Sequence, residues 1–173
     1  IGTLKAREIN ASIVLPRAEE ELRFVEQNQV EVLFFLDDNY PRRLRHFDYS
    51  PLILYYRGSQ DLNPPRTVGI VGTRTPSPHG RITTEKLVED LAGFGVVIVS
   101  GLAYGVDGCA HKKSIETGLP TLGVMGNGQN VIYPAVHKEL AKKMLKQGGL
   151  LTEFCSQTRP DKVNFPMRNR IIA

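Results

Sequence analysis

The residues best suited to chemistry in this chain are glycines and basic side chains that directly follow apolar runs. The longest such motif, SGLAYGVDGCAH from Ser100 to His111, comes after the apolar run 96–99. A strand that ends in glycines and leads into a helix leaves backbone N–H groups at the helix start, and these favour an anion such as a phosphate. Ser100 and Gly101 are therefore candidate binding residues. A tight turn without a ligand accounts for the same pattern equally well.

Two more turns and one helix start repeat this arrangement. The turns are Gly72-Thr73-Arg74 and Gly126-Asn127-Gly128, and the helix start is KVNFPMRNR, from Lys162 to Arg170. The planar guanidinium of Arg74 can hold a phosphate. Lys162 can meet a phosphate while Phe165 stacks on a base, a combination typical of single-stranded nucleic acid binding. The alternatives are a surface charge for Arg74 and a core position for Phe165.

The last of these motifs also carries Arg168, Asn169 and Arg170. The two arginines are two positions apart, so they point to different sides of a helix. One can face a ligand while the other pairs with an acid such as Glu153 or Asp107. We expect Asp107 itself to cap the helix that it begins.

Metal, cofactor and enzyme sites find little support. Asp107 and His111 can share a helix face, but no third ligand stands at a suitable spacing, and Cys109 and Cys155 are isolated. Neither G-x-G-x-x-G nor the P-loop pattern G-x-x-x-x-G-K-[ST] occurs. No nucleophile–base–acid set stands out. We therefore expect no metal, no cofactor and no catalytic residues.

The composition is that of a globular domain with room for a small appendage. The chain has 173 residues, of which 41% are hydrophobic and 23% charged. Its formal net charge of +4 permits a polyanionic partner without requiring one. No apolar stretch is long enough to cross a membrane and no signal peptide is visible, so we expect a cytoplasmic protein.

The apolar runs and the segments between them predict the fold class. From Thr67 onward, four short apolar runs alternate with helical patterns: strands at 68–71, 96–99, 122–125 and 150–153, and helices at 80–94, 107–117, 134–147 and from 165. This alternation predicts an α/β fold with a doubly wound parallel sheet. The candidate residues follow the strands, where ligands of such sheets bind.

The segment before Thr67 predicts an N-terminal α/β extension. It holds a helix after Pro16, strands at 32–36 and 53–56, and a short helix at YPRRL. Asn63-Pro64-Pro65 is a stiff connector and a candidate boundary.

In the later part of the chain, Gly148 and Gly149 are expected to end the helix at 134–147.

In these motifs, the chain resembles the DprA/Smf family, the DNA-processing proteins of bacterial natural transformation. The resemblance rests on YPRRL (40–44), YYRG (55–58), VGIVGTR (68–74), SGLAYGVDGCAH (100–111), GNGQNVIYP (126–134) and NFPMRNRIIA (164–173). It implies an extended Rossmann-like domain that binds and protects incoming single-stranded DNA. It also implies loading of a RecA-type recombinase on that strand without nucleotide hydrolysis, and a homodimer in the full-length protein.

The resemblance places Arg74, the Gly126-Asn127-Gly128 turn, Lys162 and Phe165 where the family holds its DNA. Arg168, Asn169 and Arg170 match its RNR signature, nearer the pocket floor. Two residues depart from the family pattern: Tyr104 stands where Arg is usual, and Asn127 is the middle residue of a turn that is usually GTG. The loss of a positive charge at Tyr104 is expected to weaken phosphate affinity.

The resemblance also predicts the domain organisation. Residues 1–36 are expected to be the remnant of a helical N-terminal module with its linking segment, and residues 37–173 the DNA-binding domain, apparently truncated at its C-terminus. Two other functions remain open. One is a nucleoside-monophosphate phosphoribohydrolase of the LOG (lysine-decarboxylase-like) group, whose P-G-G-x-G-T-x-x-E motif is absent from this sequence. The other is a non-catalytic nucleotide sensor.

Overall fold

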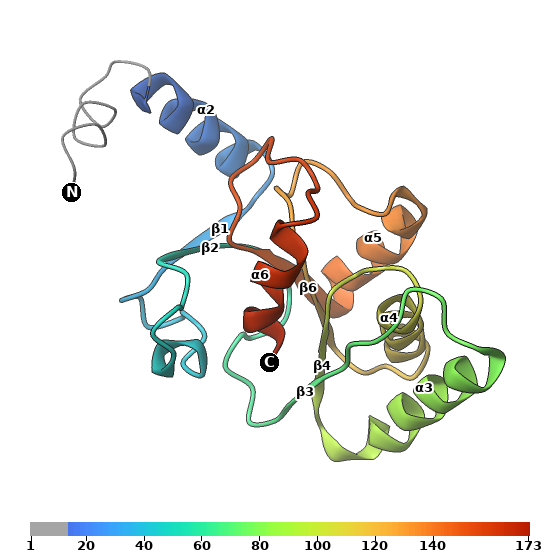
Figure 1. Ribbon diagram of the computed structural model, residues 1–173. Helices are drawn as coiled ribbons and strands as arrows, with labels where there is room; N and C mark the ends of the chain where they lie inside the picture. Colours follow the sequence, from blue (N-terminus) through green and yellow to red (C-terminus); the bar gives the residue numbers. More distant parts are fainter. Residues whose placement is uncertain (1–13) are drawn as a thin grey trace.

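The structure, a computed structural model, describes residues 14–173 (Figure 1). The predicted module remnant falls in part on residues 1–13, which lie outside the described residues. The helices are α2 (Val14–Gln27), α3 (Pro78–Leu91), α4 (Val106–Glu116), α5 (Lys138–Gln147) and α6 (Asn164–Ile172). The strands are β1 (Glu31–Phe34), β2 (Ile53–Gly58), β3 (Thr67–Gly69), β4 (Val97–Ser100), β5 (Thr121–Val124) and β6 (Gly148–Thr152).

The strands form one mixed sheet in the order β1-β2-β6-β5-β4-β3. Strands β3, β4, β5 and β6 are parallel, whereas β2 is antiparallel to both β6 and β1. Figure 1 shows α3, α4 and α5 together on one side of the parallel strands and α6 on the other. The predicted α/β fold, with a parallel sheet between helical layers, is confirmed.

Burial on both faces explains why the parallel strands are continuous apolar runs. All residues of β5 and β6 are buried, as are most of β4. Strands covered on both faces show no alternation of apolar and polar residues. Val97, Leu122 and Val124 pack on the α6 side with Ile171 and Ile172. The core therefore holds the carboxyl ends of β3 to β6 at one edge.

The N-terminal extension adds its two strands to this same sheet. The predicted helix at YPRRL is only a 3-10 helix, Leu44–His46. Arg43 of this motif donates to the carbonyl oxygens of Pro64 (2.9 Å) and Pro65 (2.8 Å), so the segment is tied to the proline connector. The division between residues 36 and 37 stays a prediction; β1 and β2, on either side of it, are paired.

Gly148 and Gly149 differ from the sequence expectation because they begin β6 rather than merely ending α5. They pair with Thr121 and Leu122 of β5. A Cβ at Gly148 would overlap the backbone of Thr121, and one at Gly149 would overlap the ring of Tyr56. Glycine is required there by the close approach of neighbouring backbone and ring, a constraint that the local sequence does not reveal.

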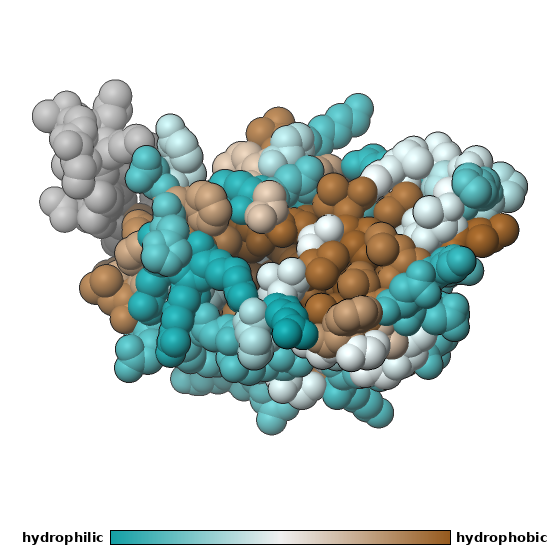
Figure 2. All heavy atoms as spheres, turned by 90° about the horizontal axis from the view of Figure 1, so that it is seen from below, coloured by the Kyte–Doolittle hydropathy of each residue, from teal (hydrophilic) through white to brown (hydrophobic). Residues whose placement is uncertain are grey.

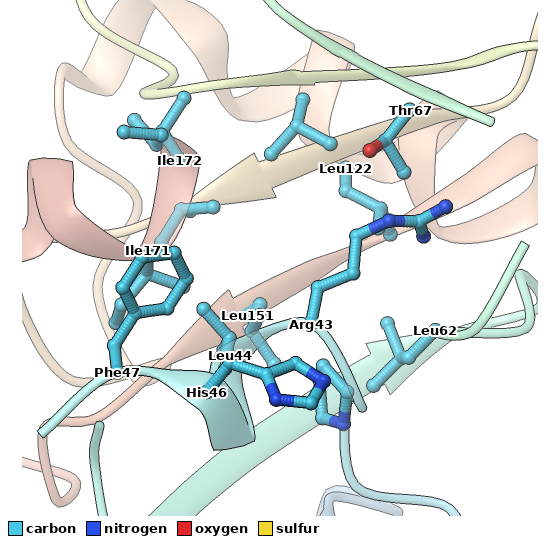
Figure 3. Close-up of a pocket in the computed structure, with 14 residues that line it drawn as sticks. Arg43, Leu44, His46, Phe47, Leu62, Thr67, Leu122, Leu151, Ile171 and Ile172 are labelled. Carbon is cyan, nitrogen blue, oxygen red and sulfur yellow. The ribbon is translucent and has the colours of Figure 1, made fainter.

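Apolar side chains gather on the face of the molecule seen in Figure 2. A groove of about 350 Å³, drawn in Figure 3, is lined by Leu44 and Phe47 of the N-terminal extension, by Leu122 and Leu151 of the sheet, and by Ile172 of α6. The predicted binding residues do not line it. The candidate site lies elsewhere, at the turns after the strands.

Candidate nucleic-acid interface

A cavity of about 450 Å³ opens where the turn after β3 meets the start of α6. Its lining includes predicted residues from widely separated segments: Gly72, Arg74, Lys162, Phe165, Arg168 and Asn169. Three of the lining side chains are cations, and Asp107 is the carboxylate among them. The size suits a small ligand or one nucleotide of a longer one, and the charge excess suits a phosphate.

Arg74 and Phe165, which both line this cavity, are in direct contact. The guanidinium carbon of Arg74 lies 5.3 Å from the centroid of the Phe165 ring. A cation over an aromatic face at this distance is an attractive contact. The predicted phosphate group and the predicted stacking group are therefore neighbours, although ninety-one positions separate them in the sequence.

Tyr133 also stacks on Phe165, with ring centroids 5.8 Å apart and planes 23° apart. Tyr133 lies within the motif GNGQNVIYP, but no binding role was predicted for it from the sequence. The available signal was an aromatic residue a few positions after a glycine turn. Tyr133 and Tyr104 both line a narrow cleft next to the first cavity, with Arg74, Gly126 and Phe165. Gly126 lies against the Phe165 ring, so a Cβ there would come within 2.8 Å of it.

Lys162 and Asn169 line the first cavity, and both are exposed. The backbone around Lys162 is held because the Asp161 carboxylate accepts the N–H of Val163 at 2.9 Å. The Asn169 side-chain oxygen accepts from Nε of Arg168 at 3.2 Å. Thr73 is exposed as well, and its hydroxyl accepts the N–H of Thr75 at 3.2 Å.

Other predicted residues are buried and bonded within the chain. The Ser100 hydroxyl donates to the carbonyl of Ile70 at 2.6 Å. The Asn127 amide donates to the carbonyl of Val131 at 2.7 Å, which closes the turn after β5. The N–H of Gly128 donates to Thr158 at 3.0 Å. A direct DNA contact by Ser100, Asn127 or Gly128 stays a prediction; within the chain these residues shape the turns.

The turn after β4 does not offer its N–H groups to an anion in the way the glycines suggest. The N–H of Gly101 donates to the Asp107 carboxylate at 3.2 Å, and that of Leu102 to the His111 ring at 3.3 Å. The N–H of Val106, the first residue of α4, donates to the carbonyl of Thr73 at 3.1 Å. The tight turn, which the sequence left open as an alternative, therefore describes these three groups.

The expectation that Asp107 caps α4 is wrong, because the N-cap is Gly105 and no side chain caps the helix. Gly105 has a φ of 78°, and a Cβ there would overlap the backbone of Thr73. The Asp107 carboxylate instead turns back to Gly101. Burial raises the pKa of Asp107, and the nearby Arg168 guanidinium opposes that rise.

Arg168 is a buried cation that joins the ends of two strands. Its guanidinium donates to the carbonyl of Gly101 at 2.6 Å and to the carbonyl of Val124. A Cβ on Gly101 would overlap both Arg168 and Asp107, so only glycine fits between them. Burial lowers the pKa of Arg168, and Asp107 offsets this. An arginine remains charged despite such a shift.

Arg170 pairs with Glu153, one of the two acids that the sequence offered. Its Nη1 lies 2.6 Å from the carboxylate of Glu153, and its Nε donates to the carbonyl of Tyr49 at 2.8 Å. The prediction that the two arginines point to different sides is confirmed, but both are held by partners within the chain. Arg168 supports the cavity floor, and Arg170 lines neither cavity.

Two buried histidines hold the backbone of Leu102, which has a φ of 56°. The His111 Nε2 accepts the N–H of Leu102 at 3.3 Å, and the His137 Nδ1 lies 2.9 Å from its carbonyl oxygen. The His111 Nδ1 lies 2.7 Å from the Thr121 hydroxyl, which donates to Ile98 at 3.1 Å. His111 is therefore neutral with its proton on Nδ1. Burial lowers the pKa of His111 to about 3.

Among residues 14–173, no group of three or more His, Cys, Asp or Glu side chains could hold a metal ion. Within the same range, no helix is long and apolar enough to cross a membrane.

We call the rim the surface beyond the carboxyl ends of the parallel strands that carries Arg74, Lys162, Phe165, Tyr104 and Tyr133. The fold and the rim together define a Rossmann-like α/β protein that presents cations and aromatic rings at this edge. The family model described as DNA recombination-mediator protein A matches residues 31–173. The chain belongs to this family, the DprA/Smf proteins, as the sequence motifs predicted.

Curated relatives agree with this assignment. The protein Smf of Synechocystis sp. is 39% identical over 158 residues, which are 87% of this chain and 40% of that protein. The DNA processing protein DprA of Bacillus subtilis is 36% identical over 159 residues, 91% of this chain and 54% of that protein. This chain spans about half the length of such relatives.

Solved structures of related proteins share the fold. DprA from Streptococcus pneumoniae matches with a TM-score of 0.76 and 36% identity, over 82% of this chain and 50% of that one. DprA from Helicobacter pylori, whose structure is described for its single-stranded DNA binding mode, matches with a TM-score of 0.74 and 31% identity. That match covers 83% of this chain and 64% of the other.

Proposed function

We propose that this chain binds single-stranded DNA at the rim beyond the parallel strands. The observation that carries the proposal is the convergence of Arg74, Lys162 and Phe165 on one cavity of about 450 Å³. Cations that meet phosphates, next to an aromatic ring, are the elements of sequence-tolerant single-strand binding. The single-stranded DNA binding described for the Helicobacter pylori protein supports the same ligand.

The predicted residues fall into two roles in this proposal. Arg74, Lys162 and Asn169 contact the strand, and Phe165 supplies the aromatic surface. The remaining predicted residues position this set. Gly72 packs closely against the side chain of Val106, and the hydrogen bonds, close packing or ion pair described above involve Thr73, Ser100, Gly101, Gly126, Asn127, Gly128, Arg168 and Arg170. Phosphate contacts give affinity without sequence choice, so little sequence preference is expected.

We further propose that the longer protein protects incoming single strands during natural transformation and loads a RecA-type recombinase on them in the cytoplasm. The family description as a recombination mediator supports this role. A homodimer of the longer protein stays a prediction. Sedimentation of that protein, and pull-down of a RecA-type recombinase on bound single strands, test the two partners.

The competing functions make a different prediction. A phosphoribohydrolase would release a nucleobase from a nucleoside monophosphate, and a nucleotide sensor would bind free mononucleotides tightly. The test is a competition titration with a labelled single-stranded oligonucleotide, challenged by unlabelled single strand, duplex or mononucleotide, beside a base-release assay. We expect single strand to compete best and no base release. Better competition by duplex or mononucleotide, or base release, would contradict the proposal.

A further inference from the structure

A separate pocket opens on the side of the sheet that α5 covers (Figure 1). Its volume is about 360 Å³, which is within the range of ligand sites. The loop 129–132, helix α5 and the strands β2 and β6 contribute its lining. It shares no residue with the cavity and the cleft at the rim, so a ligand that it holds is distinct from the strand proposed there.

Much of the lining of this pocket is apolar and continuous with the core beneath α5. Ala141 and Leu150 are each 2% exposed and belong to that core. Ile132 and Leu145 pack against it and are half-buried. Val131, which is 40% exposed, extends the same apolar surface to solvent. Covering such a surface with an apolar side chain is favourable, so the pocket offers a place for one aliphatic or aromatic group of a ligand.

Three cations line the same pocket, and no carboxylate does. They are Arg57 of β2 and Lys138 and Lys142 of α5. Lys142 pairs with Glu139 at 2.8 Å, but this pair is exposed and contributes little. Arg57 and Lys138 pair with no carboxylate of residues 14–173. The excess of positive charge favours an anionic ligand.

The side chain of Gln129 holds the wall of the pocket in place. Its Nε2 donates to the carbonyl oxygens of Tyr55 at 2.8 Å and Leu150 at 3.2 Å, which ties the loop 129–132 to β2 and β6. A preformed wall lowers the cost of ordering on binding. The Oε1 of Gln129 is enclosed and accepts no hydrogen bond from residues 14–173. An unpaired buried acceptor is costly, and a peptide N–H placed beside it would offset that cost.

The chemistry of this lining distinguishes a peptide from a nucleic acid. Single-strand sites stack bases on aromatic rings, and no aromatic side chain lines this pocket. An aliphatic surface with cations around it instead complements a peptide that carries carboxylates next to one apolar side chain. The pocket therefore differs in kind from the rim, where cations and rings occur together.

We propose that this pocket docks an acidic peptide segment of a partner protein. The segment would place one apolar side chain against the aliphatic lining and its carboxylates on Arg57, Lys138 and Lys142. The loop from Gly126 to Tyr133 lines the rim cleft at its two ends and this pocket in its middle. A docked partner would therefore lie next to the proposed DNA site, although the inference does not depend on DNA binding.

The test uses the full chain and a fluorescent peptide of four aspartates followed by leucine and phenylalanine, titrated by fluorescence anisotropy. In a second peptide two serines replace the leucine and the phenylalanine, and in a third four lysines replace the aspartates. Wild type should bind the first peptide saturably and at least about tenfold more tightly than the second, because only the first has apolar side chains to bury. The lysine peptide should not bind.

Arg57→Glu and Lys138→Glu should each weaken the first peptide at least about tenfold, since charge reversal turns an attraction into a repulsion. Val131→Ser should reduce the preference for the first peptide over the serine peptide. Arg81→Glu is the matched control, a charge reversal on the exposed surface of α3 and outside the pocket. It should leave affinity within about twofold, because salt screens distant charges. The melting temperature of each variant shows that it folds.

The outcomes separate this inference from single-strand binding. Arg57→Glu and Lys138→Glu should bind an oligothymidylate within about twofold of wild type. If they weaken the oligothymidylate and wild type binds no peptide saturably, the cations serve DNA and the peptide site is wrong. Equal binding of the serine peptide, or peptide binding that both variants leave unchanged, would also overturn the site. If wild type binds the first peptide but not the oligothymidylate, this inference holds and the proposed function fails.

Discussion

Arg74 gives the rim a cation that is both exposed and already oriented. It extends from a turn that packs against Gly105, and it lies over Phe165 rather than pairing with any carboxylate of residues 14–173. Such a cation can exchange its aromatic contact for a phosphate at small cost, since an exposed cation–π contact contributes only about 0.5–1 kcal/mol. The sequence marked Arg74 as a candidate binding residue, and its contact with Phe165 follows from the fold alone.

Replacement of Arg74 by Ala should weaken binding of every single-stranded sequence alike and flatten the salt dependence. Each lost phosphate contact reduces the slope of log affinity against log salt by about 0.7 for a single strand. Titrations over a range of salt concentrations measure this slope. Arg81→Ala, on the exposed surface of α3, is a control that should leave it unchanged. An unchanged slope in Arg74→Ala would give Arg74 a purely structural role.

Phe165→Ala should reduce both stability and binding, because the ring is half-buried and supports Tyr133. The expected loss of unfolding free energy is about 1–3 kcal/mol, below that of a fully buried phenylalanine. The salt slope should be almost intact because no phosphate contact is lost. Thermal melts and binding measured on one sample separate the effects. Full affinity in the folded fraction would contradict a role for the ring in binding.

At the scale of elements, the turn between β4 and α4 is fixed by buried groups rather than by an anion. His111 and His137 hold the two polar groups of Leu102, and Asp107 and Arg168 enclose Gly101. The motif SGLAYGVDGCAH predicted a strand that leads through glycines into a helix, and it left an anion site and a tight turn as equal alternatives. It could not show that the N–H groups are used internally, because Gly101 and Leu102 donate to side chains that only the folded turn brings back to them, and Val106 donates to Thr73, thirty-three positions earlier.

The neutral state of His111 makes stability depend on pH with a definite sign. Its pKa is about 3 in the folded chain and near 6.5 when unfolded. Between these values the unfolded chain binds a proton that the folded chain does not, so stability falls as the pH falls below about 6.5. The slope is about 1.4 kcal/mol per pH unit from this group. Denaturant melts of wild type and His111→Gln should differ by that slope; parallel profiles would contradict it.

The helix α2 anchors the loop that leads to α6. The Glu21 carboxylate accepts from the N–H of Ser156 at 2.8 Å and from its hydroxyl at 2.6 Å. Glu21→Ala should release this loop, speed amide hydrogen exchange at residues 154–163, and weaken DNA binding through Lys162. The expected stability loss is about 1–3 kcal/mol. Glu20→Ala, on the same helix, is the control; equal exchange in both variants would contradict the anchoring role.

At the scale of the whole molecule, the sequence predicted the parallel sheet and the edge of it at which the candidate residues lie. Apolar runs of the right length, alternating with helical patterns, determine that architecture locally. The antiparallel addition of β1 and β2 could not be predicted in this way, since β2 pairs with β6 more than ninety positions later. Tyr133 received no role for the same reason: its stacking partner Phe165 belongs to another element.

The arrangement of the rim predicts where a bound strand must lie, and photocrosslinking tests this most directly. A single-stranded oligonucleotide that carries a photoreactive thymine analogue would be irradiated with the protein, and the linked peptides identified by mass spectrometry. We expect crosslinks at Tyr104, Tyr133 and the segment 162–169, reduced by unlabelled single strand. Crosslinks confined to the apolar groove around Leu44 and Ile172, with the rim unlabelled, would contradict single-strand binding at this site.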